Sequence, residues 1–210
     1  MEELLTARAT LIFLVANVAL SVLAFSNDAF MRWGILNTRA VLQNKDYHRL
    51  LTSGFLHADP MHLFVNMLTL FFFGPPVEIV LGDWTDMGSN AFLFVYVGAL
   101  LGGNSFALWR HRNDPNYMAL GASGAVSGII FTFCLFAPFQ PLYVFFVIRM
   151  PAIVFALLYV VYSIYGMRTA RDNIGHDAHL GGAVIGIVIA LILYPELLQI
   201  FVGQISQVFS

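Results

Sequence analysis

The chain has 210 residues, of which 59% are hydrophobic and only 10% are charged, whereas soluble domains carry about 25% charged residues. This composition excludes a water-soluble globular domain, so we expect an integral multi-pass membrane protein whose surface meets the lipid bilayer. The net charge of −2 and the dispersed Lys and Arg residues exclude the basic patch of nucleic-acid-binding proteins, and no nucleic-acid partner is expected.

Six apolar stretches approach the roughly 20 residues that a membrane-spanning helix needs. The first is predicted to be retained, because no basic segment precedes it and no clear cleavage site follows it. Pro138 and Pro141 separate the fourth stretch from the fifth, since proline disrupts a helix interior. The predicted fold is all-α, a single domain over residues 1–210 built as a six-helix membrane bundle. Its spans are expected at roughly 9–26, 61–80, 89–109, 120–137, 142–166 and 178–197.

Two segments carry more local predictions. Segment 27–60 is polar but includes several large apolar residues, so we expect it to lie partly in the membrane interface. Arg149 falls inside the predicted fifth helix, close enough to its start for the charge to reach the interface. A buried ion pair is the alternative for this arginine.

Polar side chains inside a membrane are costly, so each is a candidate functional residue. His62 and Asn66 stand four apart at the start of the second span and therefore share one helical face. Ser123 lies at the start of the fourth span, and His179 lies at the start of the sixth. Spans two, four and six cross the bilayer in the same direction, so these residues can meet in one layer.

Glycine spacing supports that meeting. Gly124 and Gly128 are four residues apart on the fourth span, as are Gly182 and Gly186 on the sixth. Small residues at this spacing allow helix backbones to approach closely in a membrane. Contact between the two spans would bring the serine within reach of the histidine.

These residue types favour hydrolysis by a serine nucleophile. Histidine is the usual base near neutral pH, which predicts Ser123 as the nucleophile and His179 as its general base. Donors to the oxyanion could come from the Ser123 backbone N–H, the Asn66 amide and the His62 ring. Neither a cofactor nor a metal is expected, and Cys134, the only cysteine, excludes a multi-cysteine metal site.

Each motif alone has a simpler explanation. A serine in a glycine-rich helix often serves packing, and His62 with Asn66 could be an interhelical hydrogen-bonded pair. Their joint occurrence at three helix starts on one side favours the catalytic interpretation. Two other functions stay open: a catalytically inactive escort of membrane proteins, and a transporter with a proton or metal path along His62, His176, Asp177 and His179.

In combination and in this order, the motifs resemble those of the rhomboid proteases, and the resemblance covers nearly the whole chain. It implies an intramembrane serine endopeptidase that cleaves peptide bonds in or near the transmembrane segments of single-span membrane proteins. It also implies a Ser123–His179 dyad and an oxyanion hole of the Ser123 N–H, His62 and Asn66. The other residues that match the family are His57, Arg49, Glu78, Gly121, Gly124, Gly182 and Gly186.

Two positions depart from the family's pattern. The first-loop arginine usually follows a tryptophan, but His48 precedes it here. Many members carry Tyr or Phe four residues after the serine, stacked on the catalytic histidine, whereas this chain has Ser127. The aromatic support of His179 is therefore expected to come from elsewhere or to be absent. Asp177 is not expected to orient that histidine, because residues close together in the sequence of a helix point in different directions.

Two indications of membrane orientation disagree. The loops after spans one, three and five hold most of the basic residues, and the positive-inside rule would then place the N-terminus outside. The resemblance implies a cytoplasmic N-terminus, and we follow it. The membrane is expected to be the cell or inner membrane if the host is prokaryotic.

Overall fold

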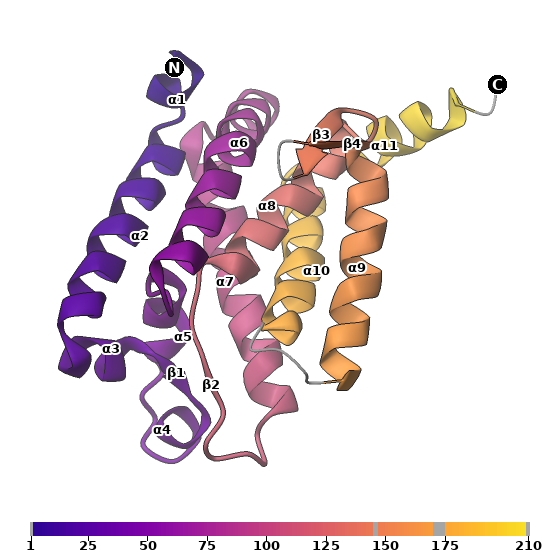
Figure 1. The fold of residues 1–210 in the computed structure, drawn as a ribbon. Helices are drawn as coiled ribbons and strands as arrows, with labels where there is room; N and C mark the ends of the chain where they lie inside the picture. The colour runs from indigo at the N-terminus through magenta and orange to yellow at the C-terminus, as the bar shows by residue number, and fades with distance from the viewer. Residues whose placement is uncertain (1, 145–146, 170–174, 209–210) are drawn as a thin grey trace.

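Long helices lying side by side dominate the computed structural model, which describes residues 2–144, 147–169 and 175–208 (Figure 1). Within these residues, five helices are long and apolar enough to cross a membrane. This confirms the predicted all-α polytopic fold. The five are α2 (Arg8–Ser26), α6 (Pro60–Thr85), α7 (Ser89–Arg110), α9 (Ala152–Thr169) and α10 (His176–Leu193).

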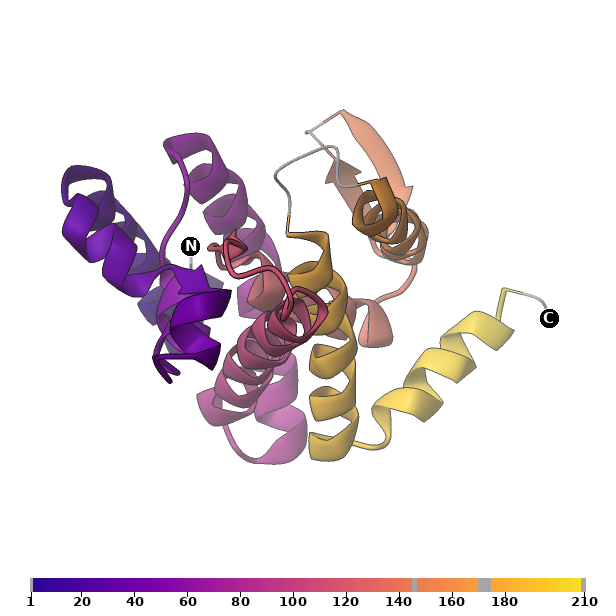
Figure 2. The same cartoon turned by 90° about the horizontal axis from the view of Figure 1, so that it is seen from below.

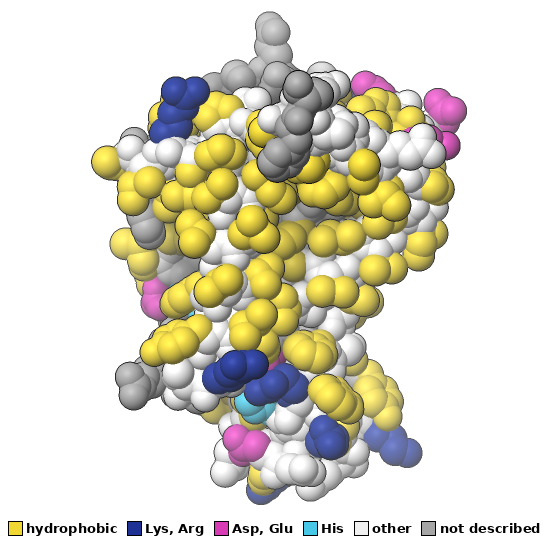
Figure 3. All heavy atoms as spheres, turned by 90° about the vertical axis from the view of Figure 1, so that its right-hand side faces the viewer, with side chains coloured by type: hydrophobic (Ala, Val, Ile, Leu, Met, Phe, Trp, Pro, Cys, Tyr) yellow, Lys and Arg dark blue, Asp and Glu magenta, His cyan; other side chains and the backbone are white. Residues whose placement is uncertain are grey.

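The surface is that of a membrane protein. Hydrophobic side chains cover the middle of the face shown in Figure 3, and Lys and Arg gather towards its lower end. Seen from below, α2 lies at one side of the bundle and α9 at the other, with α7 and α10 between them (Figure 2). The short helix α1 (Glu2–Thr6) precedes α2.

The predicted fourth span, roughly 120–137, is the central helix α8 (Ser123–Phe136), which has only 14 residues and is not among the five long helices. At 1.5 Å per residue it is about 21 Å long, shorter than the roughly 30 Å hydrocarbon layer. Every residue between its first and its last is buried, so the helix meets neighbouring helices instead of lipid. Its first turn lies well above the lower ends of α7 and α9 (Figure 1). The serine at its start is therefore sunk into the bundle.

The predicted glycine contact between α8 and α10 is confirmed. A methyl group added to Gly186 would lie 2.5 Å from the Cα of Gly128, and one added to Gly182 would lie 2.7 Å from the carbonyl carbon of Gly124. Ordinary contacts of a Cβ atom begin at 3.4 Å. Backbone therefore packs directly on backbone, as small residues permit in membranes.

Helix α6 is longer than the predicted 61–80. Asp59 caps its start by accepting the backbone N–H of His62 at 2.8 Å, and Pro60 occupies the first turn, where a missing N–H costs little. Pro75 and Pro76 lie inside the helix, but it continues to Thr85. The end predicted near residue 80 was therefore wrong.

The predicted start of the fifth span, residue 142, was also wrong. Residues Pro141–Val144 (β3) and Ile148–Pro151 (β4) form an antiparallel pair, and α9 begins only at Ala152. Aromatic and β-branched residues such as Tyr143 and Val144 suit strands, and a short apolar run cannot be assigned to helix or strand by periodicity. Arg149 is therefore an exposed residue of β4 and does not lie in a helix.

A helix that was not predicted from the sequence, α11 (Leu197–Ser206), follows α10. Pro195 follows the end of α10 and separates the two helices. The side-chain amide of Gln204 donates to the carbonyl oxygen of Phe136 at 2.7 Å, which ties α11 to the end of α8.

Segment 27–60 is folded rather than extended. It forms α3 (Asp28–Gly34), α4 (Thr38–Leu42), α5 (Arg49–Thr52) and the 3-10 helix η1 (Ser53–Phe55). Strand β1 (Leu36–Asn37) pairs with β2 (Met118–Ala119), the strand that leads to α8. Trp33, Leu42, Tyr47 and Leu51 remain exposed, which suits the predicted location in the membrane interface. These elements occupy the lower end of the molecule, below the start of α8 (Figure 1).

Candidate active site

Ser123 is the first residue of α8 and is partly exposed. The preceding Gly121 has a φ of +126°, which glycine adopts more readily than other residues. The Gly121 N–H donates to the carbonyl oxygen of Ser53 at 2.9 Å, so η1 holds the turn before the serine. Because Ser123 opens the helix, its own N–H has no acceptor within α8.

Gly121 also makes room for His62. A methyl group at Gly121 would lie 2.9 Å from Nε2 of His62 and 3.7 Å from Oγ of Ser123. The imidazole and the serine hydroxyl therefore flank the same small space. This approach of His62 to Ser123 agrees with helix parity, which predicts that spans two and four begin on the same side.

The hydrogen bonds of His62 indicate which ring nitrogen carries the proton. The N–H of Ala58 donates to His62 Nδ1 at 3.5 Å, which makes Nδ1 the acceptor. A neutral imidazole then carries its proton on Nε2, the atom beside Gly121. The buried Asn66 donates one amide N–H to the carbonyl oxygen of His62 at 2.9 Å, which leaves it a second amide proton. Its place in an oxyanion hole stays a prediction.

His57 connects this turn to α2. The N–H of Ala122 donates to His57 Nε2 at 3.4 Å. The proton of a neutral ring then lies on Nδ1, which donates to Ser21 Oγ at 2.9 Å, and Ser21 in turn donates to the carbonyl oxygen of Phe55 at 3.0 Å. Burial, with a smaller contribution from His62, lowers the pKa of His57 to about 3, so the ring is neutral at physiological pH.

His179 lies in the first turn of α10, where its N–H donates to the carbonyl oxygen of Gly175 at 3.0 Å. A methyl group at Gly124 would lie 3.2 Å from the carbonyl oxygen of Ala178. These two residues are the sequence neighbours of Ser123 and His179. The first turns of α8 and α10, which carry the predicted dyad, are therefore in contact.

An aromatic ring does support His179, and it comes from α9. The ring of Tyr159 stacks on the imidazole with a centroid distance of 5.8 Å and an interplanar angle of 25°. The Tyr159 hydroxyl is hydrogen-bonded to Ser127, the residue at the position where the family often has an aromatic ring. Nothing in the sequence pointed to Tyr159, because it is far from both residues along the chain.

Asp177 binds partners on the side of α7. Its carboxylate pairs with Arg110 Nε at 2.8 Å and with His111 Nε2 at 2.6 Å. The His111 ring lies parallel to that of Tyr117 at 3.8 Å. The carboxylate therefore ties α10 to the end of α7, which agrees with the expectation that it does not orient His179.

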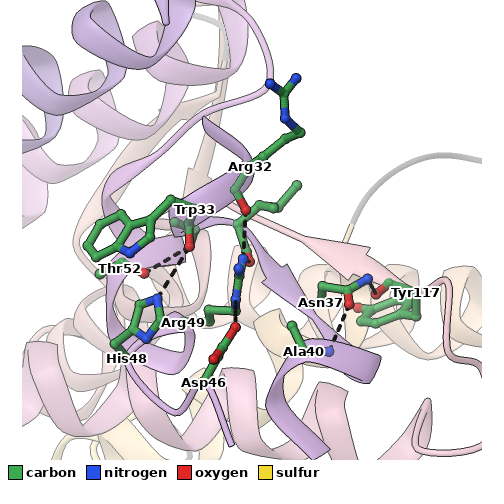
Figure 4. Close-up of polar contacts among 11 residues, drawn as sticks. Arg32, Trp33, Asn37, Ala40, Asp46, His48, Arg49, Thr52 and Tyr117 are labelled. Carbon is green, nitrogen blue, oxygen red and sulfur yellow. Dashed lines mark hydrogen bonds and ion pairs between the residues drawn. The ribbon is translucent and has the colours of Figure 1, made fainter. Parts of the chain in front are cut away.

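Arg49 organises the loop between α2 and α6 (Figure 4). Its Nη1 donates to the carbonyl oxygens of Arg32 at 2.7 Å and Ile35 at 2.8 Å, and its Nε pairs with Asp46 at 3.2 Å. The guanidinium group presents several fixed donors, so one side chain holds three points of the loop.

In the family a tryptophan usually stands directly before this arginine. Here His48 stands at that position and stacks on Trp33. His48 lies over the ring of Trp33 at a centroid distance of 4.9 Å (Figure 4). An aromatic layer therefore covers the loop even though its residues are separated in sequence.

Glu78 joins α6 to the start of α2. Its carboxylate accepts the backbone N–H groups of Ala9 at 2.8 Å and Thr10 at 2.7 Å, and it also accepts the hydroxyl of Ser89. The first N–H groups of a helix lack intrahelical acceptors, and negative charge is favourable there. Glu78 is thus a cap supplied by a neighbouring helix.

No group of three or more His, Cys, Asp or Glu side chains in the described part of the chain could hold a metal ion. The site consists of protein groups on α6, α8, α9 and α10.

Comparison with known proteins gives the family. The model of the Rhomboid domain matches residues 44–196. The chain belongs to the rhomboid family. This is a family of intramembrane proteases that also includes inactive members, and the match spans all of the predicted site residues.

Two relatives are similar over most of this rhomboid chain, and a third is similar over a shorter stretch. RHOMBOID-like protein 12, mitochondrial, of Arabidopsis thaliana is 27% identical over 197 residues, covering 82% of this chain and 57% of its own. Rhomboid protein 1, mitochondrial, of Saccharomyces cerevisiae is 29% identical over 164 residues, covering 74% and 45%. YdcA of Bacillus subtilis is 36% identical over 87 residues, covering 41% and 39%. The chain thus spans about half the length of the curated relatives it matches.

Proposed function

We propose that this rhomboid-family protein is an intramembrane serine endopeptidase with Ser123 as nucleophile and His179 as general base. The observation that carries the proposal is the small space at Gly121, flanked by the serine hydroxyl and the His62 ring. The contact between Gly124 and Ala178 supports it from the other side, because it sets the first turns of α8 and α10 against each other.

The proposed reaction is an acyl transfer. Ser123 Oγ attacks the carbonyl carbon of the scissile peptide bond while His179 accepts the hydroxyl proton. The resulting imidazolium returns that proton to the leaving amine nitrogen, and the C–N bond breaks. Water then attacks the acyl-enzyme with His179 again as base, which releases the new carboxyl group and restores the serine.

The oxyanion of each tetrahedral intermediate needs donors that are already in place. The Ser123 N–H supplies one, since it opens α8. His62 Nε2–H supplies a second, because its Nδ1 is the acceptor of the Ala58 N–H. The free N–H of the Asn66 amide supplies a third. One such donor is worth roughly 3–4 kcal/mol in soluble serine proteases.

Depth in the bundle supports single-span membrane proteins as substrates. Helix α8 is too short to reach both membrane surfaces, and its start lies well above the lower ends of α7 and α9 (Figure 1), which supports a position of Ser123 below the interface. A peptide bond there belongs to a transmembrane segment or its edge. We propose a cytoplasmic N-terminus, with the site opening on the opposite side. Basic residues at the lower ends of α7 and α9 argue for the reverse, and a reporter fused to each terminus tests this.

The membrane that holds the protein stays a prediction: the cell or inner membrane if the host is prokaryotic. Two of the three relatives described above are mitochondrial by name.

The test uses protein reconstituted in liposomes with single-span reporter substrates. We expect wild type to cleave and to be labelled by a fluorophosphonate, and Ser123→Ala to do neither. The matched control is Ser105→Ala, because Ser105 is an exposed serine of α7. Cleavage that survives in Ser123→Ala refutes the serine mechanism. A wild type that neither cleaves nor labels favours the inactive escort instead.

A further inference from the structure

One face of α9 packs on the histidines at the start of α10. Tyr159 stacks on His179, and the ring of Tyr162 meets His176 edge-on at 5.0 Å. Gly166 lies directly against the His176 imidazole, where a side chain would overlap the ring. The three α9 residues are spaced i, i+3 and i+7, so they form one stripe.

Tyr159 is held by a hydrogen bond at its hydroxyl group and by aromatic contacts of its ring. Ser127 donates its hydroxyl proton to the carbonyl oxygen of Ser123 at 2.7 Å, so the proton in its bond with Tyr159 must come from the tyrosine. Phe131 packs edge-on against the same ring at 5.8 Å, and Phe155 lies 6.0 Å away. These contacts fix the position of the ring independently of its contact with His179.

We propose that Tyr159 is a positioning residue for the catalytic base, and that Ser127 fixes it to the helix of the nucleophile. The proposal rests on the proposed function. Ser127 bonds the backbone of Ser123 and the Tyr159 hydroxyl, and Tyr159 stacks on His179. One chain of contacts thus links the two members of the dyad through a third helix.

The chemistry explains why a ring is useful there. The carboxylate nearest to His179 in sequence, Asp177, is held by Arg110 and His111. A stacked ring fixes the plane of the imidazole. It also favours the imidazolium that forms during the reaction, because a cation is attracted to an aromatic face within about 6 Å. The benefit appears in the transition state and therefore in kcat more than in KM.

The first test compares variants of Tyr159 in the reconstituted enzyme. Tyr159→Leu removes the ring, and we expect kcat to fall by about tenfold with KM within about twofold of wild type. Tyr159→Phe keeps the ring but loses its anchor, and a fall of about two- to threefold is expected. The matched control is Tyr165→Leu on the lipid-facing side of α9, where Tyr165 is 57% exposed. Its kcat and KM should equal those of wild type.

The second test moves the ring to the other helix. Ser127 and Tyr159 touch, so the pair Ser127→Phe with Tyr159→Ala fills the same gap from α8. We expect the kcat of the double variant to be at least threefold higher than the kcat of Tyr159→Ala. Thermal unfolding of Ser127→Ala, Tyr159→Phe and their combination gives a second readout. The two changes should be non-additive, because each removes the same hydrogen bond.

The outcomes separate the inference from the proposed function. Wild-type kcat in Tyr159→Leu overturns the positioning role, and so does a loss that appears equally in Tyr165→Leu. If Tyr159→Leu does not fold, the double variant decides, and failure to recover kcat counts against the inference. An inactive, unlabelled wild type overturns the proposed function, and the inference falls with it.

Discussion

The glycine contact between α8 and α10 leads to a quantitative prediction for Gly182→Ala. The added methyl group would overlap the backbone of Gly124, lying 2.7 Å from its carbonyl carbon and 2.9 Å from its Cα. Backbone atoms cannot rotate away as a side chain does. The two helices must separate by about 1 Å to reach ordinary van der Waals contact.

Gly124 follows the proposed nucleophile directly, so this separation moves the nucleophile away from its base. A misplacement of about 1 Å can cost about 100-fold in rate, and overpacking of a core costs about 1–3 kcal/mol of stability. We therefore expect Gly182→Ala to lower kcat/KM by about 100-fold and to lower the free energy of unfolding by about 1–3 kcal/mol.

The assay is cleavage of a single-span reporter in liposomes, with thermal unfolding of the same preparations. Gly203→Ala is the matched control, because beyond its chain neighbours and the nearby backbone of its own helix, no described atom lies within 4 Å of the added methyl group. Its activity should be unchanged. Activity of Gly182→Ala within twofold of wild type would refute the reasoning that backbone contact between these helices sets the distance of the dyad.

Three further changes test the supports of the site. Glu78→Gln weakens the cap at the start of α2 and should lower the free energy of unfolding by about 1–3 kcal/mol. Glu196→Gln, at an exposed position, is the control and should leave the free energy of unfolding unchanged. Equal thermal unfolding of the two variants would contradict this. Arg49→Lys cannot reach all three partners, so the loop it holds should become more sensitive to limited proteolysis, with Arg39→Lys as the exposed control. Because His57 has a native pKa of about 3 against an ordinary 6.5, the unfolded state binds its proton first, and stability should fall as pH drops below 6.5. The loss is about 1.4 kcal/mol at pH 5.5, measured by unfolding in detergent, and a slope that persists in His57→Gln would count against it.

Part of the arrangement of the candidate residues could be predicted from the sequence. His62, Ser123 and His179 stand out as candidates because polar groups are rare inside membranes and helix parity places them on one side. The glycine pairs predicted the contact of α8 with α10. These signals are local in sequence, or repeat at a helical spacing.

The residues that His57 and Ser127 contact could not be predicted, because these contacts join distant segments. Ser127 lies 32 residues from Tyr159, and Ser21 lies 36 residues from His57. The hairpin before α9 was missed for another reason, since its apolar residues satisfy either a strand or a buried helix. The composition of α8 also does not reveal that the helix is buried along its length or that it has only 14 residues.

The shortness of α8 has a consequence for how the protein responds to its lipids. Outer helices must match the hydrophobic thickness of the bilayer, and they tilt when that thickness changes. Helix α8 is buried among other helices and contacts almost no lipid, so its length does not need to match the bilayer thickness. Its start is instead fixed by protein partners, Ser53 and His57 below and the glycines of α10 beside it. The depth of Ser123 is thus a property of the fold. Under the proposed function, a thicker or thinner bilayer would change which bond of a substrate reaches the serine without changing the geometry around it.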